Sequence, residues 1–161
     1  MTYIKSDNPI CDYIQLHFQD ATIQGTKMTW NIPNVYYSNL NSPVCTVVLE
    51  EAAVSTSQNL NLLVKWLGSV QNGFNTRNSG IVLSHLFRMF DGGVSTNYCN
   101  NYPSDVKVLT TARPQSITLE IIEANDSPIL IDSSAVFVLK FEYYDYKAVT
   151  NGLINSSYPI L

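Results

Sequence analysis

The chain has 161 residues and a mass of 18.0 kDa, the size of one compact domain. Hydrophobic residues make up 45% of it and charged residues only 14%, while 16 Asn, 16 Ser and 12 Thr supply most of the polar surface. This apolar content excludes a disordered chain, and the lack of Ala, Glu, Lys and Leu enrichment excludes a coiled coil. The net charge is −4 and no two basic residues are adjacent, which argues against direct nucleic-acid binding.

The sequence carries no sign of secretion or of a membrane anchor. Residues 1–7 lack the charged start and apolar run of a signal peptide, and no window holds 18 consecutive apolar residues, so we expect no membrane span. The three cysteines, Cys11, Cys45 and Cys99, are odd in number and far apart. We therefore expect reduced thiols and an intracellular setting.

Apolar and polar residues alternate along almost the whole chain, which is the period of half-buried β-strands. The predicted strands cover residues 14–19, 27–32, 44–50, 60–66, 81–90, 106–111, 117–121 and 135–146. The residues predicted to face the core are Ile14, Leu16, Phe18, Met28, Trp30, Ile32, Leu60, Leu62, Val64, Trp66, Phe137, Leu139, Phe141 and Tyr143. Residues 81–87 have the composition of a buried helix too, but their length and neighbours favour a strand.

Turn-forming residues separate these runs. Asn-Gly at 72–73, Ser-Gly at 79–80, Asp-Gly-Gly at 91–93 and Asn-Asp-Ser-Pro at 125–128 suit chain reversals. Eight or so short strands in one acidic domain predict a β-sandwich or a β-barrel. Residues 147–161 lose the alternation and are interpreted as a tail.

Neither histidine makes a convincing catalytic group. His17 lies on the polar face of a predicted strand, and His85 lies within an apolar run. His85 could act as a general base toward a serine, but no nucleophile-elbow spacing is present, which favours a hydrogen-bonded core or edge histidine. The cysteines and histidines are too isolated for a zinc site, and no stretch has the pattern of a calcium loop.

The carboxylates give no better case for an enzyme. A glycosidase pair could be drawn from Glu50, Glu51, Glu120 and Glu123, but their positions within strands favour solvent-facing charges. The Gly-Gly pair at 92–93 lacks the lysine and the helix of a phosphate loop. We therefore assign no catalytic, cofactor-binding or metal-ligating residue and expect no enzyme and no cofactor.

Tyrosine is the other unusual feature. Tyrosines combine a large, stiff contact area with a polar tip, which suits interfaces, but they also cap sandwich cores. Both interpretations apply to the tyrosines that are predicted in loops or at strand ends, and the low charge of the chain favours interfaces. The tyrosines at such positions are Tyr36, Tyr37, Tyr98, Tyr102, Tyr143, Tyr144, Tyr146 and Tyr158.

Residues 60–146 resemble a known family in the order of their features. LNLLVKWL at 60–67 precedes an Asn/Ser loop, the strand IVLSHL at 81–86, and an Asp/Gly/Asn/Tyr-rich excursion. ARPQSITLEI at 112–121 and the hairpin NDSPI at 125–129 lead to VFVLKFE at 136–142. This order resembles the single jelly-roll vertex (penton) or minor capsid proteins of polinton-like viruses, virophages and related double-jelly-roll DNA viruses. Those hairpins commonly have a glycine where Ser127 stands.

The resemblance implies an all-β fold, a single jelly-roll β-sandwich of about eight strands with extended terminal segments. An N-terminal arm would cover 1–9, the jelly roll 10–146, and a C-terminal tail 147–161. The implied function is a vertex or minor component of an icosahedral capsid, assembled inside the host cell. Its partners would be copies of itself, as a pentamer at the vertex, together with the major capsid protein and other minor proteins.

A different class of function stays open. A ligand-binding jelly roll would use exposed Tyr, Trp and Asn to bind glycans or a receptor, and the segment from Tyr98 to Tyr102 could supply them. Glycan binding without self-association would favour this alternative.

Overall fold

A computed structural model describes residues 2–5, 9–38, 42–57, 61–68, 80–91, 96–100, 106–123, 125, 127–143 and 146–149. The described chain is all-β, with two short 3₁₀ turns, η1 (Phe18–Asp20) and η2 (Asn34–Tyr36). The strands within these residues are β1 (Thr2–Lys5), β2 (Ile10–His17), β3 (Thr22–Gln24), β4 (Lys27–Asn31), β5 (Val44–Thr56), β6 (Leu62–Trp66), β7 (Ile81–Asp91), β8 (Thr96–Cys99), β9 (Val108–Thr111), β10 (Ser116–Glu123), β11 (Val136–Tyr143) and β12 (Tyr146–Val149).

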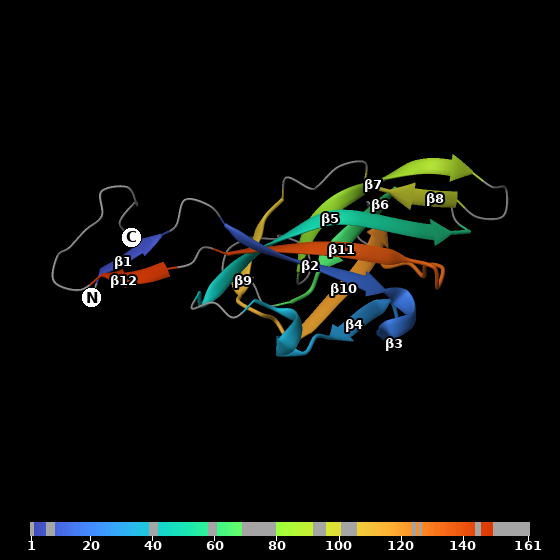
Figure 1. The fold of residues 1–161 in the computed structure, drawn as a ribbon. Helices are drawn as coiled ribbons and strands as arrows, with labels where there is room; N and C mark the ends of the chain where they lie inside the picture. The colour runs from blue at the N-terminus through green and yellow to red at the C-terminus, as the bar shows by residue number, and fades with distance from the viewer. Residues whose placement is uncertain are drawn as a thin grey trace.

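Ten of the described strands form one antiparallel sheet that folds over into two layers (Figure 1). The strand order is β2-β11-β5-β8-β7-β6-β10-β4-β3, and β9 pairs with the start of β5. The strand β7 belongs to both layers, because its first half pairs with β6 and its second half, from Phe87, pairs with β8. The ring of Trp30 on β4 meets that of Phe137 on β11 edge-on, with centroids 6.0 Å apart, so the two layers pack face to face.

The core follows the predicted alternation. On β11, Phe137, Leu139, Phe141 and Tyr143 are all buried, and on β6 Leu62, Val64 and Trp66 are buried. Met28, Trp30, Ile14 and Leu16 are buried as well, while Ile32 and Phe18 are partly buried against the same cluster. Leu60 lies outside the described residues. Side chains of period two therefore fill the space between the layers.

The long strand β5 departs from the alternation at a β-bulge. Glu51 pairs with Val138 and Leu49 with Leu139, so Glu50 is an extra residue. The buried side chain of Asn100 bridges this irregularity: its amide donates to the carbonyl of Glu50 at 3.1 Å, and its oxygen accepts the N–H of Ala52. A side chain thus replaces the ladder bonds that the bulge interrupts.

A second, separate sheet joins the two ends of the described chain. The strand β1 pairs antiparallel with β12, from Thr2 opposite Val149 to Lys5 opposite Tyr146. This two-stranded ribbon lies at one end of the sandwich in Figure 1. The start of the predicted N-terminal arm is therefore paired with the start of the predicted tail.

The main sheet has ten strands where the sequence suggested about eight in all. Two strands of this sheet that the alternation missed are β3 and β8, which have only three and four residues. In β8 just Thr96 and Tyr98 point inward, and two positions are too few for a periodic signal.

Candidate binding groove

The two ends of the folded sheet come together along one side of the sandwich, here called the open flank. There β2 faces the C-terminal half of β4, and within the described residues β3 covers only the first half of β4. A groove of about 380 Å³ lies between these edges. Its apolar lining includes Ile14, Leu16, Trp30, Ile32 and Pro33.

Two polar contacts flank the groove. At the β2 end nearer Ile10, the carboxylate of Asp12 accepts hydrogen bonds from the backbone N–H and the hydroxyl of Ser38, both at 2.8 Å. At the other end, the indole Nε1 of Trp30 donates to the carbonyl of His17 at 2.8 Å. These contacts tie β2 to the segment after η2 at one end and to β4 at the other, on either side of an opening that spans residues 13–16.

The backbone of β2 is open to the groove. Phe18 donates its N–H to Ala135 beside β11, at 2.9 Å, so the even-numbered residues of β2 direct their backbone groups toward β11. The backbone groups of Tyr13 and Gln15 consequently point away from β11. The carbonyl of His17 points the same way and accepts the hydrogen bond from Trp30. An edge of this kind is able to accept an extended partner or a polar ligand.

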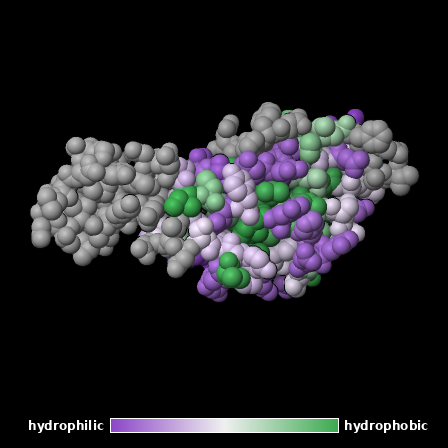
Figure 2. All heavy atoms as spheres, in the orientation of Figure 1, coloured by the Kyte–Doolittle hydropathy of each residue, from purple (hydrophilic) through white to green (hydrophobic). Residues whose placement is uncertain are grey.

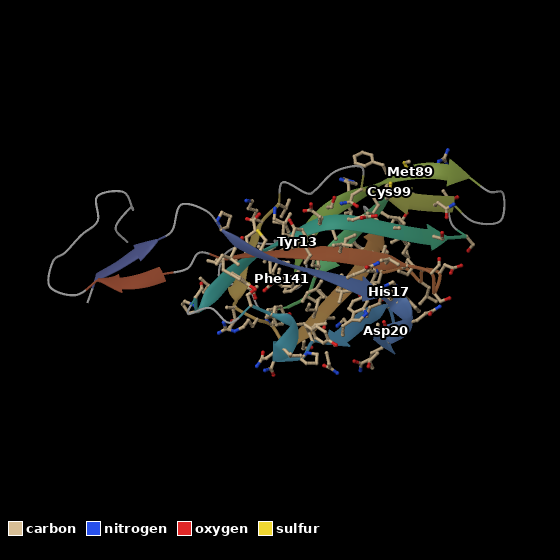
Figure 3. All side chains as sticks on the ribbon, in the orientation of Figure 1. Tyr13, His17, Asp20, Met89, Cys99 and Phe141 are labelled. Atoms are coloured by element: carbon tan, nitrogen blue, oxygen red, sulfur yellow. The ribbon has the colours of Figure 1, made fainter. Side chains whose placement is uncertain are left out.

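Aromatic rings form the rim of the groove. Tyr13 is 60% exposed and Tyr36 is 69% exposed, and both line the groove. Gln15, His17, Asn31 and Asp20 supply its polar groups. Figure 3 places Tyr13, His17 and Asp20 along β2 and η1, at the edge of the front layer.

The lining is suited to binding. The described residues that line the groove include no serine, threonine, cysteine or lysine beside His17. Aromatic faces, amides and one carboxylate around an apolar floor are the groups that bind a partner side chain or a small polar molecule. The sequence predicted His17 to face outward, but Tyr13 was not among the tyrosines singled out, because it precedes the predicted strand.

The other histidine lies elsewhere. His85 is exposed on β7, the strand where the sheet folds over, on the side opposite the open flank. The structure therefore does not bring the two histidines together. Within the described residues, no group of three or more His, Cys, Asp or Glu is placed to hold a metal ion.

The carboxylates considered as an acid–base pair are separated by the fold. Glu50 and Glu51 lie on β5, and Glu120 and Glu123 lie on β10, in the other layer. Glu51 is exposed as expected, but the prediction of a solvent-facing Glu120 was wrong: it is buried and accepts a hydrogen bond from Thr26 at 2.7 Å. Its carboxylate therefore ties the middle of β10 to the turn between β3 and β4.

Most of the singled-out tyrosines that the structure describes belong to the core. Tyr37, Tyr98 and Tyr143 are buried, and only Tyr36 is exposed. The hydroxyl of Tyr37 donates to the carbonyl of Pro114 at 2.5 Å, and burial raises its pKa. The side chains of Tyr102, Tyr144, Tyr146 and Tyr158 lie outside the described residues.

The three cysteines form no disulfide bond with one another. Cys45 is buried, and this burial raises its pKa to about 11. Cys11 is half-buried, and desolvation likewise raises its pKa. Both thiols are therefore poorly ionised near neutral pH.

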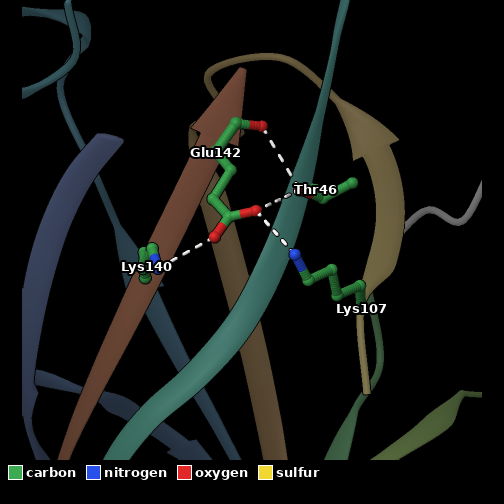
Figure 4. A network of polar contacts seen from close by, with 4 residues as sticks. All are labelled: Thr46, Lys107, Lys140 and Glu142. Atoms are coloured by element: carbon green, nitrogen blue, oxygen red, sulfur yellow. Dashed lines mark hydrogen bonds and ion pairs between the residues drawn. The ribbon is translucent and has the colours of Figure 1, made fainter. Parts of the chain in front are cut away.

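A small charge network lies on the outer side of β11 (Figure 4). The carboxylate of Glu142 binds the ammonium of Lys140 at 2.8 Å and that of Lys107 at 3.1 Å. Burial alone would raise the pKa of Glu142, but the hydrogen bonds from both lysines lower it below its ordinary value. This network joins β11 to the segment before β9, a structural role.

No helix in the described part of the chain is long and apolar enough to cross a membrane. A comparison with known proteins finds no matching family model, no similar curated protein and no similar solved structure. The function is therefore argued from the groove and the fold.

Proposed function

We propose that this chain is a viral structural protein, a vertex (penton) or minor component of an icosahedral DNA-virus capsid that acts by protein–protein assembly. The observation that carries the proposal is the open flank, where the sandwich presents an unpaired strand edge, an apolar groove and exposed aromatic rings. Exposed apolar groups around a groove are typical of sites that other proteins cover. Val35, 83% exposed next to Tyr36, extends this apolar surface.

The architecture is compatible with a single jelly roll. A jelly roll consists of two antiparallel layers joined by strands far apart in sequence. Here β2 pairs with β11 and β4 with β10, so the first strands of the sandwich pair with the last in both layers. The chain length suits one such unit, whereas the major capsid proteins of the resembling viruses have two.

The first test is the mass of the purified chain in solution, by light scattering on a sizing column. A particle of five times 18.0 kDa supports the vertex role. A monomer that binds a double-jelly-roll major capsid protein supports the minor role. A monomer that fails to bind that protein and is missing from purified virions contradicts the proposal.

A glycan-binding module is the second candidate, favoured by the composition of the same groove. Exposed Tyr13 and Tyr36 could stack on sugar rings, while Asn31 and Asp20 could bind hydroxyl groups. Of the segment expected to serve this purpose, Tyr98 is buried, and Tyr102 lies outside the described residues. Binding to a glycan array that Tyr36→Ala abolishes, in a chain that does not self-associate, would favour this candidate.

A further inference from the structure

A second apolar surface lies on β7, in the part of the strand that no longer pairs with β6 and pairs with β8 instead. Phe87 is 47% exposed and Met89 is 61% exposed, and Arg88 between them is exposed too. These three residues, here called the β7 corner, belong to the half of β7 that pairs with β8. Met89 is labelled beside Cys99 at the upper edge of the sandwich in Figure 3.

The topology places the β7 corner opposite the groove. In the strand order, β7 stands in the middle of the folded sheet, while β2 and β4 stand at or next to its two ends. Because the ends of the sheet meet at the open flank, the strand at the fold lies on the far flank. Figure 3 agrees, with Met89 at one edge of the molecule and His17 and Asp20 at the other.

The two flanks each expose apolar side chains and carry opposite charges. The groove is concave with an apolar floor, whereas the β7 corner presents two exposed apolar side chains. Among the described residues that line the groove, Asp20 carries a formal negative charge, and Arg88 carries a positive charge at the corner. Complementary charges around an apolar contact fix the orientation in which two surfaces meet. Figure 2 shows hydrophobic surface in separate patches on the front face, so the whole face is not uniformly apolar.

We propose that the groove receives the β7 corner of a second copy of this chain. Phe87 and Met89 of one copy then contact Tyr13, Tyr36 and the apolar floor of the next. This contact joins two different patches, so it is heterologous and leaves one groove and one corner free in every dimer. It rests on the proposed assembly function and names the two surfaces through which copies would meet around a symmetric vertex.

The test uses one exposed residue from each patch. Tyr36→Asp alters the groove and Met89→Asp alters the β7 corner, and each is expected to raise the dissociation constant for self-association at least about tenfold. Leu130→Asp is the matched control, because Leu130 is 73% exposed and belongs to neither patch. Circular dichroism and thermal unfolding establish that all three variants remain folded.

Mixing the two variants is the decisive measurement. The groove variant retains an intact corner and the corner variant an intact groove, so the mixture should form a one-to-one dimer that grows no further. Sedimentation of the mixture should then show a species of twice 18.0 kDa, which neither variant forms alone. A contact between identical patches could not be rescued in this way.

A charge exchange tests the orientation. Asp20→Lys and Arg88→Glu should each weaken association, and the double variant should recover most of the loss. Equal losses that add in the double variant would contradict the contact between these two residues.

Several outcomes overturn the inference without touching the proposed function. Self-association that both variants leave unchanged, or a mixture that forms no dimer, assigns the interface to other surfaces. Groove variants that lose glycan binding but keep self-association assign the groove to sugars. A wild-type chain that remains at 18.0 kDa over a concentration series also overturns it, whereas the capsid proposal fails only if the major capsid protein is not bound either.

Discussion

Replacement of Asn100 by alanine should destabilise the fold by about 2–4 kcal/mol. Asn100 is 7% exposed, and its side chain makes two hydrogen bonds with β5, one to the bulge residue Glu50 and one to Ala52. Alanine would leave the N–H of Ala52, a fully buried residue, without this partner, which costs about 1–3 kcal/mol. Loss of the second bond, to the carbonyl of Glu50, adds about 1 kcal/mol.

The assay is urea unfolding followed by circular dichroism, with the slope of the transition required to match that of the wild type. Asn97→Ala is the control, because Asn97 is an exposed asparagine of β8, the strand that Asn100 follows, and its side chain accepts a hydrogen bond from Ser55. The control should change stability by no more than about 0.5 kcal/mol. Equal effects of the two substitutions would refute the conclusion that Asn100 sustains the bulge.

Three further predictions concern the core, the thiols and the charge network. Phe137→Ala should cost about 3–5 kcal/mol in urea unfolding, because the ring is fully buried between the layers; a loss under about 1 kcal/mol would contradict this packing. Cys45 should resist a thiol reagent at pH 8 until the chain unfolds, since it is buried and its pKa is raised to about 11; rapid labelling in the folded chain would contradict this burial. The lowered pKa of Glu142 contributes stability that is fully present above the pKa of an unfolded glutamate and is lost as the pH falls through the folded value. Glu142→Gln should therefore reduce stability at pH 7 by about 1 kcal/mol and flatten its acid dependence; an unchanged pH profile would show that the lysines contribute nothing.

Local pattern was enough to assign the all-β class and most of the core. The alternation on β11 identified Phe137, Leu139, Phe141 and Tyr143 as inward-facing, and all are buried. This works because side chains of a strand alternate strictly between its two faces, so one apolar face is visible in the sequence. The pattern fails where a neighbour covers the outer face too, as for Glu120, which is buried although it alternates with core residues.

The candidate site depends on pairing between distant segments, which no local pattern contains. Tyr13 and Tyr36 lie on one groove because β2 is the last strand of one layer and β4 is left half-covered by a short β3. The same long-range pairing buries Tyr37 and Tyr98, although their sequence surroundings resemble those of Tyr36. Alternation thus predicts which residues of a strand share a face. The exposure of that face depends on which strands lie at the edges of the sheet. Non-local hydrogen bonding and packing determine that strand order.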